Sequence, residues 1–179
     1  MLPPPRLATL DDAPAIARLL RENREFLAPY EPHREDSYFT DAGQRAELEA
    51  VLTAHAAGTM APYVVLAPTG EVAGRITLGG IVRGALLSGV IGYWVAQRHT
   101  RQGLASAAVA HVVRTAFDEL GLHRLEAGTL VGNTASQRVL ARNGFERFGL
   151  APRYLRIAGR WQDHVLFQRT NPRLEEGEG

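Results

Sequence analysis

The segment from Tyr93 to Ala105 has residue types and a spacing that favour the binding of a phosphorylated ligand. Its first four residues, Tyr93 to Ala96, have the composition of a strand, and a helical spacing begins at Gly103 after a polar turn. The first N–H groups of a helix have no acceptor within the helix and carry about half a positive charge, so they attract anions. Arg98 and Arg101 add positive charge to the turn. The segment therefore predicts a phosphate or pyrophosphate site, the alternative being an ordinary strand–helix turn with tight packing.

Other kinds of chemistry are excluded by residues that the chain lacks. None of its 179 residues is Cys, which excludes disulfides, thiolate metal sites and a thiol nucleophile. All 20 basic residues are Arg, so a P-loop Lys and a Schiff-base Lys are excluded as well. The six His residues have no spacing typical of metal ligands, and we predict no metal site.

Charge is divided unevenly along the chain, although the formal net charge is only +1. Residues 1–89 hold 8 Arg and 11 acidic residues, a balance of −3, whereas residues 90–179 hold 12 Arg and 8 acidic residues, a balance of +4. We therefore expect any anion to bind to the second half. The small net charge argues against a general nucleic-acid coat, so no direct nucleic-acid partner is predicted.

Neither a secretion signal nor a membrane segment is predicted. The start, Met1 to Arg6, has three Pro and no apolar run, and the uncharged stretch Gly84 to Gln97 is too short to span a bilayer. We therefore expect a cytoplasmic protein with no membrane partner. The length and the 45% share of hydrophobic residues predict one domain over residues 1–170, followed by a frayed acidic tail at 171–179.

Four helices are expected to support the segment with the predicted anion site. Thr9 and Asp12 have the spacing of a capping box at the start of the first helix. A Pro-rich loop or broken helix at Phe26–Tyr38 separates it from a second helix, which begins at Asp41 and ends near Gly58. Two more helices are predicted by their spacing, at Gly103–Leu120 and Asn133–Arg142.

The strands predict the sheet to which these helices attach. Apolar and alternating runs bounded by turn residues lie at Tyr63–Leu66, Val72–Val82, Leu86–Ala96, Arg124–Val131, Phe145–Ile157 and Trp161–Arg169. With a first strand before Thr9, the order is β, α, α, β, β, β, α, β, α, β, β. This order favours an α+β fold with a mostly antiparallel sheet and one parallel step.

Two landmarks of the chain resemble the GNAT superfamily of N-acetyltransferases. Arg101-Gln102-Gly103-Leu104-Ala105, after a strand that ends in Trp94-Val95-Ala96, is similar to the acetyl-CoA-binding motif of that family. Asn133-Thr134-Ala135-Ser136, followed by Val139-Leu140 and Asn143-Gly144-Phe145, resembles the family's next motif at a matching distance. The resemblance implies a three-layer α/β/α arrangement around a central mixed, mostly antiparallel sheet.

Further stretches resemble the subgroup that acetylates the N-terminal alanine of ribosomal proteins. They are Arg6–Leu20, Phe26–Phe39 and Trp161–Val165, so the resemblance covers essentially the whole chain. One position departs from the family pattern: Thr100 stands where the first motif usually has Gln or Arg. Backbone N–H groups make most of the phosphate contacts in such a motif, so Thr100 need not abolish binding, and it stays open whether Arg98 or Arg101 substitutes.

The resemblance implies that acetyl-CoA binds along the strand–helix junction. The N–H groups from Arg101 to Ser106 would hold the pyrophosphate, and Trp94 to Ala96 would pair with the pantetheine arm like an added strand. The N–H group of Val95 would face the thioester oxygen. Asn133 would hydrogen-bond the pantetheine, the alternative being a plain helix N-cap. The expected cofactor-binding residues are Trp94, Val95, Ala96, Arg98, Arg101, Gln102, Gly103, Leu104, Ala105, Ser106, Asn133 and Ser136.

The resemblance also implies direct acetyl transfer, which needs a neutral amine and a proton for the departing thiolate. Ser136 is expected to supply that proton, the alternatives being a solvent-facing Ser and Tyr154 as a rival acid. Glu126 is a candidate base because burial on a strand would raise its pKa, but an ion pair with an Arg is equally open. Asp163 and His164 point to opposite faces of the last strand, so only one can enter the cleft. A bound water relayed by backbone carbonyls is a further alternative for the base. The predicted catalytic residues are Ser136 as the acid, with Glu126 and Asp163 as candidates for the base.

These features together predict an acetyl-CoA-dependent N-acetyltransferase. The preferred acceptor is a protein N-terminal α-amine of the ribosomal-protein-alanine type, for which a weak base suffices because its pKa is near 8. The acidic first half would attract a basic chain terminus, and His33, Glu35 and Tyr38 are candidates for substrate contact or for a solvated loop. The alternatives are a small-molecule amine acetyltransferase and a non-catalytic acyl-CoA-binding sensor on the same fold. A homodimer is compatible with the sequence.

Overall fold

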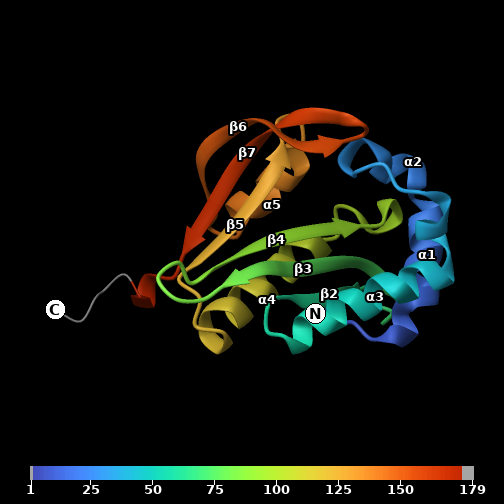
Figure 1. Cartoon of the computed structure of the whole chain (residues 1–179), viewed down its shortest axis with the longest axis horizontal. Coiled ribbons are helices and arrows are strands. Elements are labelled where there is room, and N and C mark those ends of the chain that lie inside the picture. Colours follow the sequence, from blue (N-terminus) through green and yellow to red (C-terminus); the bar gives the residue numbers. More distant parts are fainter. Residues whose placement is uncertain (1, 175–179) are drawn as a thin grey trace.

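A seven-stranded sheet forms the centre of the computed structural model, which describes residues 2–174 (Figure 1). The strands are β1 (Arg6–Leu7), β2 (Ala61–Leu66), β3 (Val72–Val82), β4 (Ser88–Val95), β5 (Arg124–Leu130), β6 (Glu146–Ile157) and β7 (Arg160–Thr170). The helices are α1 (Ala13–Glu22), α2 (Arg24–Leu27), α3 (Asp41–Ala56), α4 (Leu104–Arg114) and α5 (Thr134–Arg142). The predicted elements are confirmed, with boundaries that shift by a few residues.

The strands are ordered β1-β2-β3-β4-β5-β7-β6 across the sheet. Strands β4 and β5 pair in parallel, and the other neighbouring pairs are antiparallel. Strands β2, β3 and β4 form the predicted meander, and α4 is the crossover between β4 and β5. The α+β class and the single parallel step are therefore confirmed.

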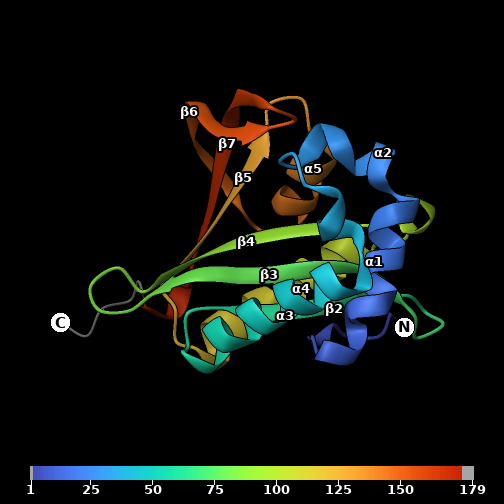
Figure 2. The same cartoon turned by 45° about the vertical axis from the view of Figure 1, so that its right-hand side comes forward.

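Helices cover both faces of the sheet because neighbouring strand residues point into two separate cores. On β2, Tyr63 lies in one core together with Val109 of α4. Val64 lies in the other core, together with Leu20 of α1 and Leu48 of α3. This alternation is what strand geometry requires when both faces are buried. Figure 2 shows α1 and α3 on one side of the strands and α4 on the other, which is the expected three-layer arrangement.

The first helix begins where the sequence predicts it. The carboxylate of Asp12 accepts a hydrogen bond from the Thr9 N–H group at 2.8 Å and pairs with Arg6 at 2.7 Å. A short 3₁₀ turn, Leu10–Asp12, therefore leads into α1. This ion pair also ties the edge strand β1 to the start of α1.

The Pro-rich stretch after α1 is a broken helix, one of the two predicted forms. Helix α2 ends at Leu27, and two 3₁₀ turns follow at Ala28–Tyr30 and Asp36–Phe39. Between them, the carbonyl oxygen of Glu31 accepts a hydrogen bond from the Ala158 N–H group at 2.9 Å. The stretch is thereby attached to the turn between β6 and β7, far away in the sequence.

Strands β4 and β5 separate after a short contact, and their separation opens the sheet. Their pairing covers Ser88–Val90 and Arg124–Glu126, whereas both strands continue for several residues beyond it. In Figure 1 the two strands diverge toward the side on which α2 lies. Beyond the contact, the facing backbone edges of β4 and β5 lack the partner strand that a closed sheet would provide.

The chain end is packed on the domain as far as it is described. The side chain of Asn171 is buried and donates to the carbonyl oxygen of Leu122 at 3.2 Å, and Pro172–Leu174 form a 3₁₀ turn. Residues 175–179 of the predicted tail lie outside the described residues. No helix within residues 2–174 is both long and apolar enough to cross a bilayer.

Candidate functional site

The turn before α4 presents a row of unused backbone donors. Gly103 is the N-cap of α4 and has a left-handed backbone with φ +82°, and Arg101 is left-handed as well, with φ +61°. In the part of the chain that the structure describes, the N–H groups from Arg101 to Ser106 have no hydrogen-bond acceptor. Six such donors at a helix start are suited to an anion of more than one phosphate group.

Some side chains around this turn bond within the protein, and others face a cavity. Arg98 pairs with Glu22 at 2.7 Å and with Glu71 at 3.6 Å, so its charge is used within the protein. Thr100 donates its hydroxyl to the Gln97 carbonyl oxygen at 2.8 Å. Arg101, by contrast, lines the cavity beside the turn. Of the two Arg side chains considered as substitutes at the Thr100 position, Arg101 is the one that faces the cavity.

This first cavity, which we call the cofactor-side cavity, has a volume of about 440 Å³. It brings together nine of the twelve residues predicted to bind the cofactor: Trp94, Val95, Arg101, Gly103, Leu104, Ala105, Ser106, Asn133 and Ser136. Ala96, Arg98 and Gln102 do not line it. Ala96 is fully buried and donates its N–H group to Ala73, and the Gln102 amide donates to the Arg98 carbonyl oxygen. These three residues shape the turn rather than line the cavity.

The end of β4 exposes backbone groups to the gap between β4 and β5. The N–H group of Ala96 points to β3, where it donates to the Ala73 carbonyl oxygen at 2.8 Å. Successive N–H groups of a strand point to opposite edges, so that of Val95 points toward the gap. The donor predicted to face a thioester oxygen is therefore oriented for that contact.

A second cavity of about 380 Å³, the inner chamber, lies between the diverging strands. There the hydroxyl of Tyr93 lies 2.9 Å from the Ser136 hydroxyl and 3.2 Å from the Ser136 carbonyl oxygen. Burial raises the pKa of Tyr93 to about 12, so this phenol stays protonated at neutral pH. When Tyr93 donates to the Ser136 hydroxyl oxygen, the Ser136 proton is free to be donated elsewhere.

Asn133 joins the cavities. It is the N-cap of α5, and its side-chain oxygen accepts from the Ser136 N–H group at 3.1 Å. It also lines the cofactor-side cavity, the inner chamber and a third, outer cavity. The two roles weighed for Asn133, helix cap and cavity residue, are thus compatible in the structure.

Thr129 on β5 has the one buried side-chain polar atom that lacks a hydrogen-bond partner among the described residues. Its side chain lines the inner chamber, and the residue is 4% exposed. Buried hydroxyl groups are almost always hydrogen-bonded, since an unpaired one costs about 1–3 kcal/mol. A polar group that enters the chamber would find in this hydroxyl an unused hydrogen-bond partner.

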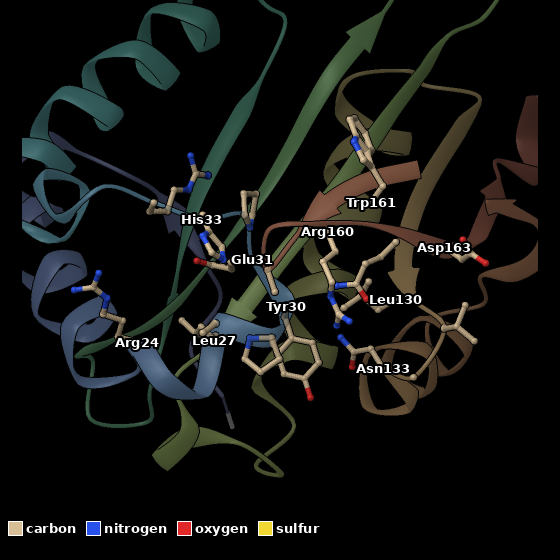
Figure 3. A pocket seen from close by; sticks show the side chains of 18 of the residues that line it. Arg24, Leu27, Tyr30, Glu31, His33, Leu130, Asn133, Arg160, Trp161 and Asp163 are labelled. Carbon is tan, nitrogen blue, oxygen red and sulfur yellow. The ribbon is translucent and has the colours of Figure 1, made fainter. Parts of the chain in front are cut away.

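The outer cavity, with a volume of about 1110 Å³, opens on the other side of the sheet gap. Figure 3 shows its walls: Leu27, Tyr30, Glu31 and His33 come from the broken helix, and Leu130, Asn133, Arg160 and Trp161 come from the end of β5 and the β6–β7 hairpin. The indole of Trp161 is 63% exposed at its rim. We call it the acceptor-side cavity because it reaches the same chamber from the side opposite to the turn before α4.

The acceptor-side cavity lacks the acidic lining that the charge of the first half of the chain suggests. Three Arg residues line it, against the two carboxylates of Glu31 and Asp163. Arg24 pairs with Asp36 at 2.7 Å, whereas Arg160 has no ion pair among the described residues. The expected attraction for a basic chain terminus is therefore not supported by the residues that line this cavity.

The structure does not bring Glu126 to any of the three cavities. Its carboxylate accepts a hydrogen bond from Arg124 at 2.7 Å, at the end of the sheet where β4 and β5 are still paired. Asp163 lines the acceptor-side cavity, but its carboxylate accepts from the Arg153 N–H group at 2.9 Å. His164, on the opposite face of β7, is buried and lines the inner chamber.

The remaining candidate residues differ in whether they line a cavity. His33 lines the acceptor-side cavity and Tyr38 the inner chamber, whereas Glu35 lines none of the three. Tyr154 lines none of them either, and its half-exposed ring lies against His164 at 5.6 Å.

Three residues of this site were not predicted from the sequence. Tyr93 and Thr129 were assigned to strands without a chemical role, and Glu31 was not among the three candidates of its loop, which begin two residues later at His33. The Tyr93–Ser136 contact joins residues 43 positions apart, and no local sequence pattern predicts it. For Glu31 a signal exists: a carboxylate between Tyr30 and Pro32, in a stretch with two Pro residues, is held in a defined backbone.

Comparison with known proteins agrees with this geometry. The family described as Acetyltransferase (GNAT) domain matches residues 6–146. The probable N-acetyltransferase YjcK of Bacillus subtilis (strain 168) is 35% identical over 92% of this chain and 92% of its own length. The [ribosomal protein uS5]-alanine N-acetyltransferase of Escherichia coli (strain K12) is 34% identical over 93% of this chain and 87% of its own length. Among solved structures, Mycobacterium smegmatis RimJ in complex with CoA-disulfide superposes with a TM-score of 0.89 at 32% identity, covering 98% of this chain and 90% of that one.

Proposed function

The chain belongs to the GNAT family of acetyltransferases, and from that premise we propose that it acetylates the N-terminal α-amine of a protein with acetyl-CoA, as a ribosomal-protein-alanine acetyltransferase does. The observation that carries this proposal is the acceptor-side cavity. Its volume of about 1110 Å³ exceeds what a small amine requires, and it meets the inner chamber at Leu27, Tyr30, Glu31, Arg34, Leu130 and Asn133. A ribosomal acceptor would place the activity in the cytoplasm.

The residues on the cofactor side fit acetyl-CoA. The six unpaired N–H groups from Arg101 to Ser106 match a pyrophosphate, and the orphan Thr129 hydroxyl matches a polar group between the strands. The free edge of β4 at Val95 would pair with the amide groups of the pantetheine arm. When bound, acetyl-CoA supplies a thioester whose carbonyl carbon is activated toward an amine.

Each group of this chain then has a defined task. The N–H group of Val95 would stabilise negative charge on the thioester oxygen, an interaction whose loss typically costs about 3–4 kcal/mol. Ser136 would donate its hydroxyl proton to the sulfur, with Tyr93 hydrogen-bonded to it at 2.9 Å. Asn133 holds the first turn of α5, and with it Ser136, in place.

A thiol-release assay tests the proposal directly. The purified chain is mixed with acetyl-CoA and three kinds of acceptor: a peptide that begins with a free Ala, the same peptide with a blocked N-terminus, and small primary amines. We expect rapid thiol release with the free peptide and none with the blocked one. Release with small amines alone would favour a small-molecule acetyltransferase, and cofactor binding without acceptor-dependent release would favour a sensor.

A further inference from the structure

We propose that Glu31 is the catalytic residue that receives the acceptor ammonium group and removes its proton. The inference rests on the proposed acetyl transfer and names the group that serves as its base. It replaces Glu126 and Asp163, whose carboxylates are engaged elsewhere by Arg124 and by the Arg153 N–H group.

The position of Glu31 is the first argument. Among residues 2–174, it is the one carboxylate that lines both the acceptor-side cavity and the inner chamber. Asp163 lines only the former and Glu47 only the latter, and no acidic residue lines the cofactor-side cavity. In Figure 3, Glu31 lies beside His33 on the wall formed by the broken helix, whereas Asp163 lies at the far end of the cavity. Glu31 is therefore the carboxylate available to an amine where the outer cavity and the chamber meet.

The backbone of Glu31 is fixed, which is the second argument. Its carbonyl oxygen accepts from the Ala158 N–H group at 2.9 Å, so the β6–β7 turn holds it from the opposite wall. Its φ of −118° and ψ of 156° are extended, as expected for a residue before Pro32. The backbone that carries this carboxylate is therefore in place before the acceptor arrives, which limits the positions that the side chain can reach.

The chemistry of the side chain is the third argument. No described residue donates a hydrogen bond to the Glu31 carboxylate or pairs with it. Burial raises the pKa of Glu31, against the opposing charges of Arg34 in the same loop and Arg75 on β3. A raised pKa makes the carboxylate a stronger base toward an α-amine, whose own pKa is near 8.

Other titratable groups face the same chamber. They are Tyr38 from the 3₁₀ turn, Glu47 from α3, Tyr93 from β4 and His164 from β7, while His33 adjoins Glu31 in the outer cavity. The proximity of Glu31 contributes to a raised pKa of Tyr38, after burial, which indicates that the two groups interact electrostatically. A pH profile of the reaction must therefore be compared between variants rather than read from one curve.

The proposed proton transfer balances. One proton of the acceptor ammonium passes to the Glu31 carboxylate, and the freed lone pair of nitrogen forms the C–N bond while the C–S bond breaks. The Ser136 hydroxyl donates its proton to the departing sulfur and takes the second nitrogen-bound proton in its place. Glu31 releases its proton to solvent, and the third proton stays on the amide nitrogen.

The test compares Glu31→Gln with Glu35→Gln, the same change four residues later in the same loop, at a residue that lines none of the three cavities. We expect Glu31→Gln to lower kcat/KM at pH 7 by about 100-fold or more, and Glu35→Gln to leave it unchanged. The deficit of Glu31→Gln should shrink as the pH rises past about 8, because the amine then loses its proton without help. Glu31→Asp, which keeps the carboxylate, should retain more activity than Glu31→Gln.

Two measurements without turnover complete the test. Calorimetry should give an unchanged affinity of Glu31→Gln for CoA, which shows that the variant is folded, and a weakened affinity of the CoA-loaded variant for the free-Ala peptide. Activity of Glu31→Gln within about threefold of wild type, or a deficit that is independent of pH, would overturn the inference while the proposed function stands. A wild-type chain that releases no thiol with any amine would overturn the proposed function, and the inference with it. A wild-type chain active only on small amines would overturn the proposed function alone. The Glu31 variants would then be compared with that small amine as the acceptor.

Discussion

The two entrances to the inner chamber, the cofactor-side cavity and the acceptor-side cavity, differ in the chemical groups that they present to a ligand. The polar donors of the cofactor side are backbone N–H groups from Arg101 to Ser106, six consecutive residues at one helix start. The acceptor side consists of side chains from three segments that lie far apart in the sequence, near residues 27–34, 130–133 and 158–163. Backbone donors recognise a phosphate whatever side chains surround them, whereas side chains recognise a particular partner. The comparison teaches that one entrance is suited to a ligand common to a family and the other to an acceptor that differs between its members.

The largest expected effect is on the cofactor side. Gly103→Glu places a negative side chain beside the unpaired N–H groups, and we expect the affinity for CoA to fall by at least about 100-fold, or about 3 kcal/mol. The fold should persist, because a Cβ at Gly103 would meet only a Leu2 methyl group, at 3.7 Å. Calorimetry with CoA measures the loss.

Gly58→Glu is the matched control for this change. Gly58 has a left-handed φ of +72° with open space around it and lines none of the three cavities. In both variants a non-glycine residue in the left-handed conformation lowers the free energy of unfolding by about 1–2 kcal/mol, but only Gly103→Glu should weaken CoA binding. Equal affinity of the two variants for CoA would show that the turn before α4 is not the phosphate site.

Between the two entrances lies Ser136, where the next largest effect is expected. Ser136→Ala removes the proposed proton donor, and kcat should fall by about 100-fold while the affinity for CoA changes little. Thr134→Ala removes a hydroxyl two residues earlier, at an exposed position that lines no cavity, and should leave kcat unchanged. An unaltered kcat of Ser136→Ala would remove Ser136 from the mechanism and leave Tyr93 as the nearest proton donor.

The difference between the entrances also explains how much the sequence could predict. The residues that meet at the cofactor-side cavity could be grouped from the sequence because strand, turn, Gly103 and helix follow one another in the chain, so local rules suffice. Nine of the twelve predicted cofactor residues line one cavity. The other three have partners away from it: Ala96 bonds to Ala73, Arg98 pairs with Glu22, and the Gln102 amide bonds to the Arg98 carbonyl oxygen.

The acceptor side could not be predicted in the same way. Pro32 marks Glu31 as a residue of defined backbone, but its place at the cavity depends on distant segments. Its carbonyl oxygen accepts a hydrogen bond from the Ala158 N–H group 127 positions later, and α2 and the β6–β7 hairpin line the same cavity. The alternation of β5 suggested burial of Glu126, but the side chain finds Arg124 on its own strand, two residues away and therefore on the same face. The partners of Glu31 and Glu126 depend on tertiary packing, which the periodicity of the sequence does not predict.

A smaller effect is expected from a charge on the acceptor side. Arg160 lines the acceptor-side cavity with no ion pair among the described residues, and Figure 3 shows it on the wall beside Leu130 and Asn133. Arg160→Glu should shift the kcat/KM ratio of an acidic Ala-Glu peptide over a basic Ala-Arg peptide by about fivefold, toward the basic one, as exposed ion pairs of up to about 1 kcal/mol allow. Arg147→Glu, an exposed change on β6 away from the cavities, should leave the ratio alone. A shift of equal size in both variants would mean that overall charge, not the cavity, attracts the acceptor.

The smallest effect, at Thr129, separates function from stability most sharply. Thr129→Val keeps the shape and β-branching of the side chain but removes the orphan hydroxyl, so the free energy of unfolding should rise by about 1 kcal/mol in the absence of ligand. If the hydroxyl is kept for a polar group of the cofactor, the affinity for CoA should fall about threefold at the same time, since one neutral hydrogen bond contributes about 0.5–1.5 kcal/mol.

Chemical denaturation with and without CoA measures both changes on one sample. A gain in stability with unchanged CoA affinity would assign the unpaired hydroxyl to the acceptor side or to no ligand, because Thr129 lines the chamber that both entrances share. A loss of stability would show instead that the hydroxyl is satisfied in the free protein, and the orphan would cease to be an argument for a ligand. A rise in the free energy of unfolding together with a fall in the affinity for CoA is therefore the result that assigns Thr129 to the cofactor side. A hydroxyl with a purely structural role cannot produce both changes.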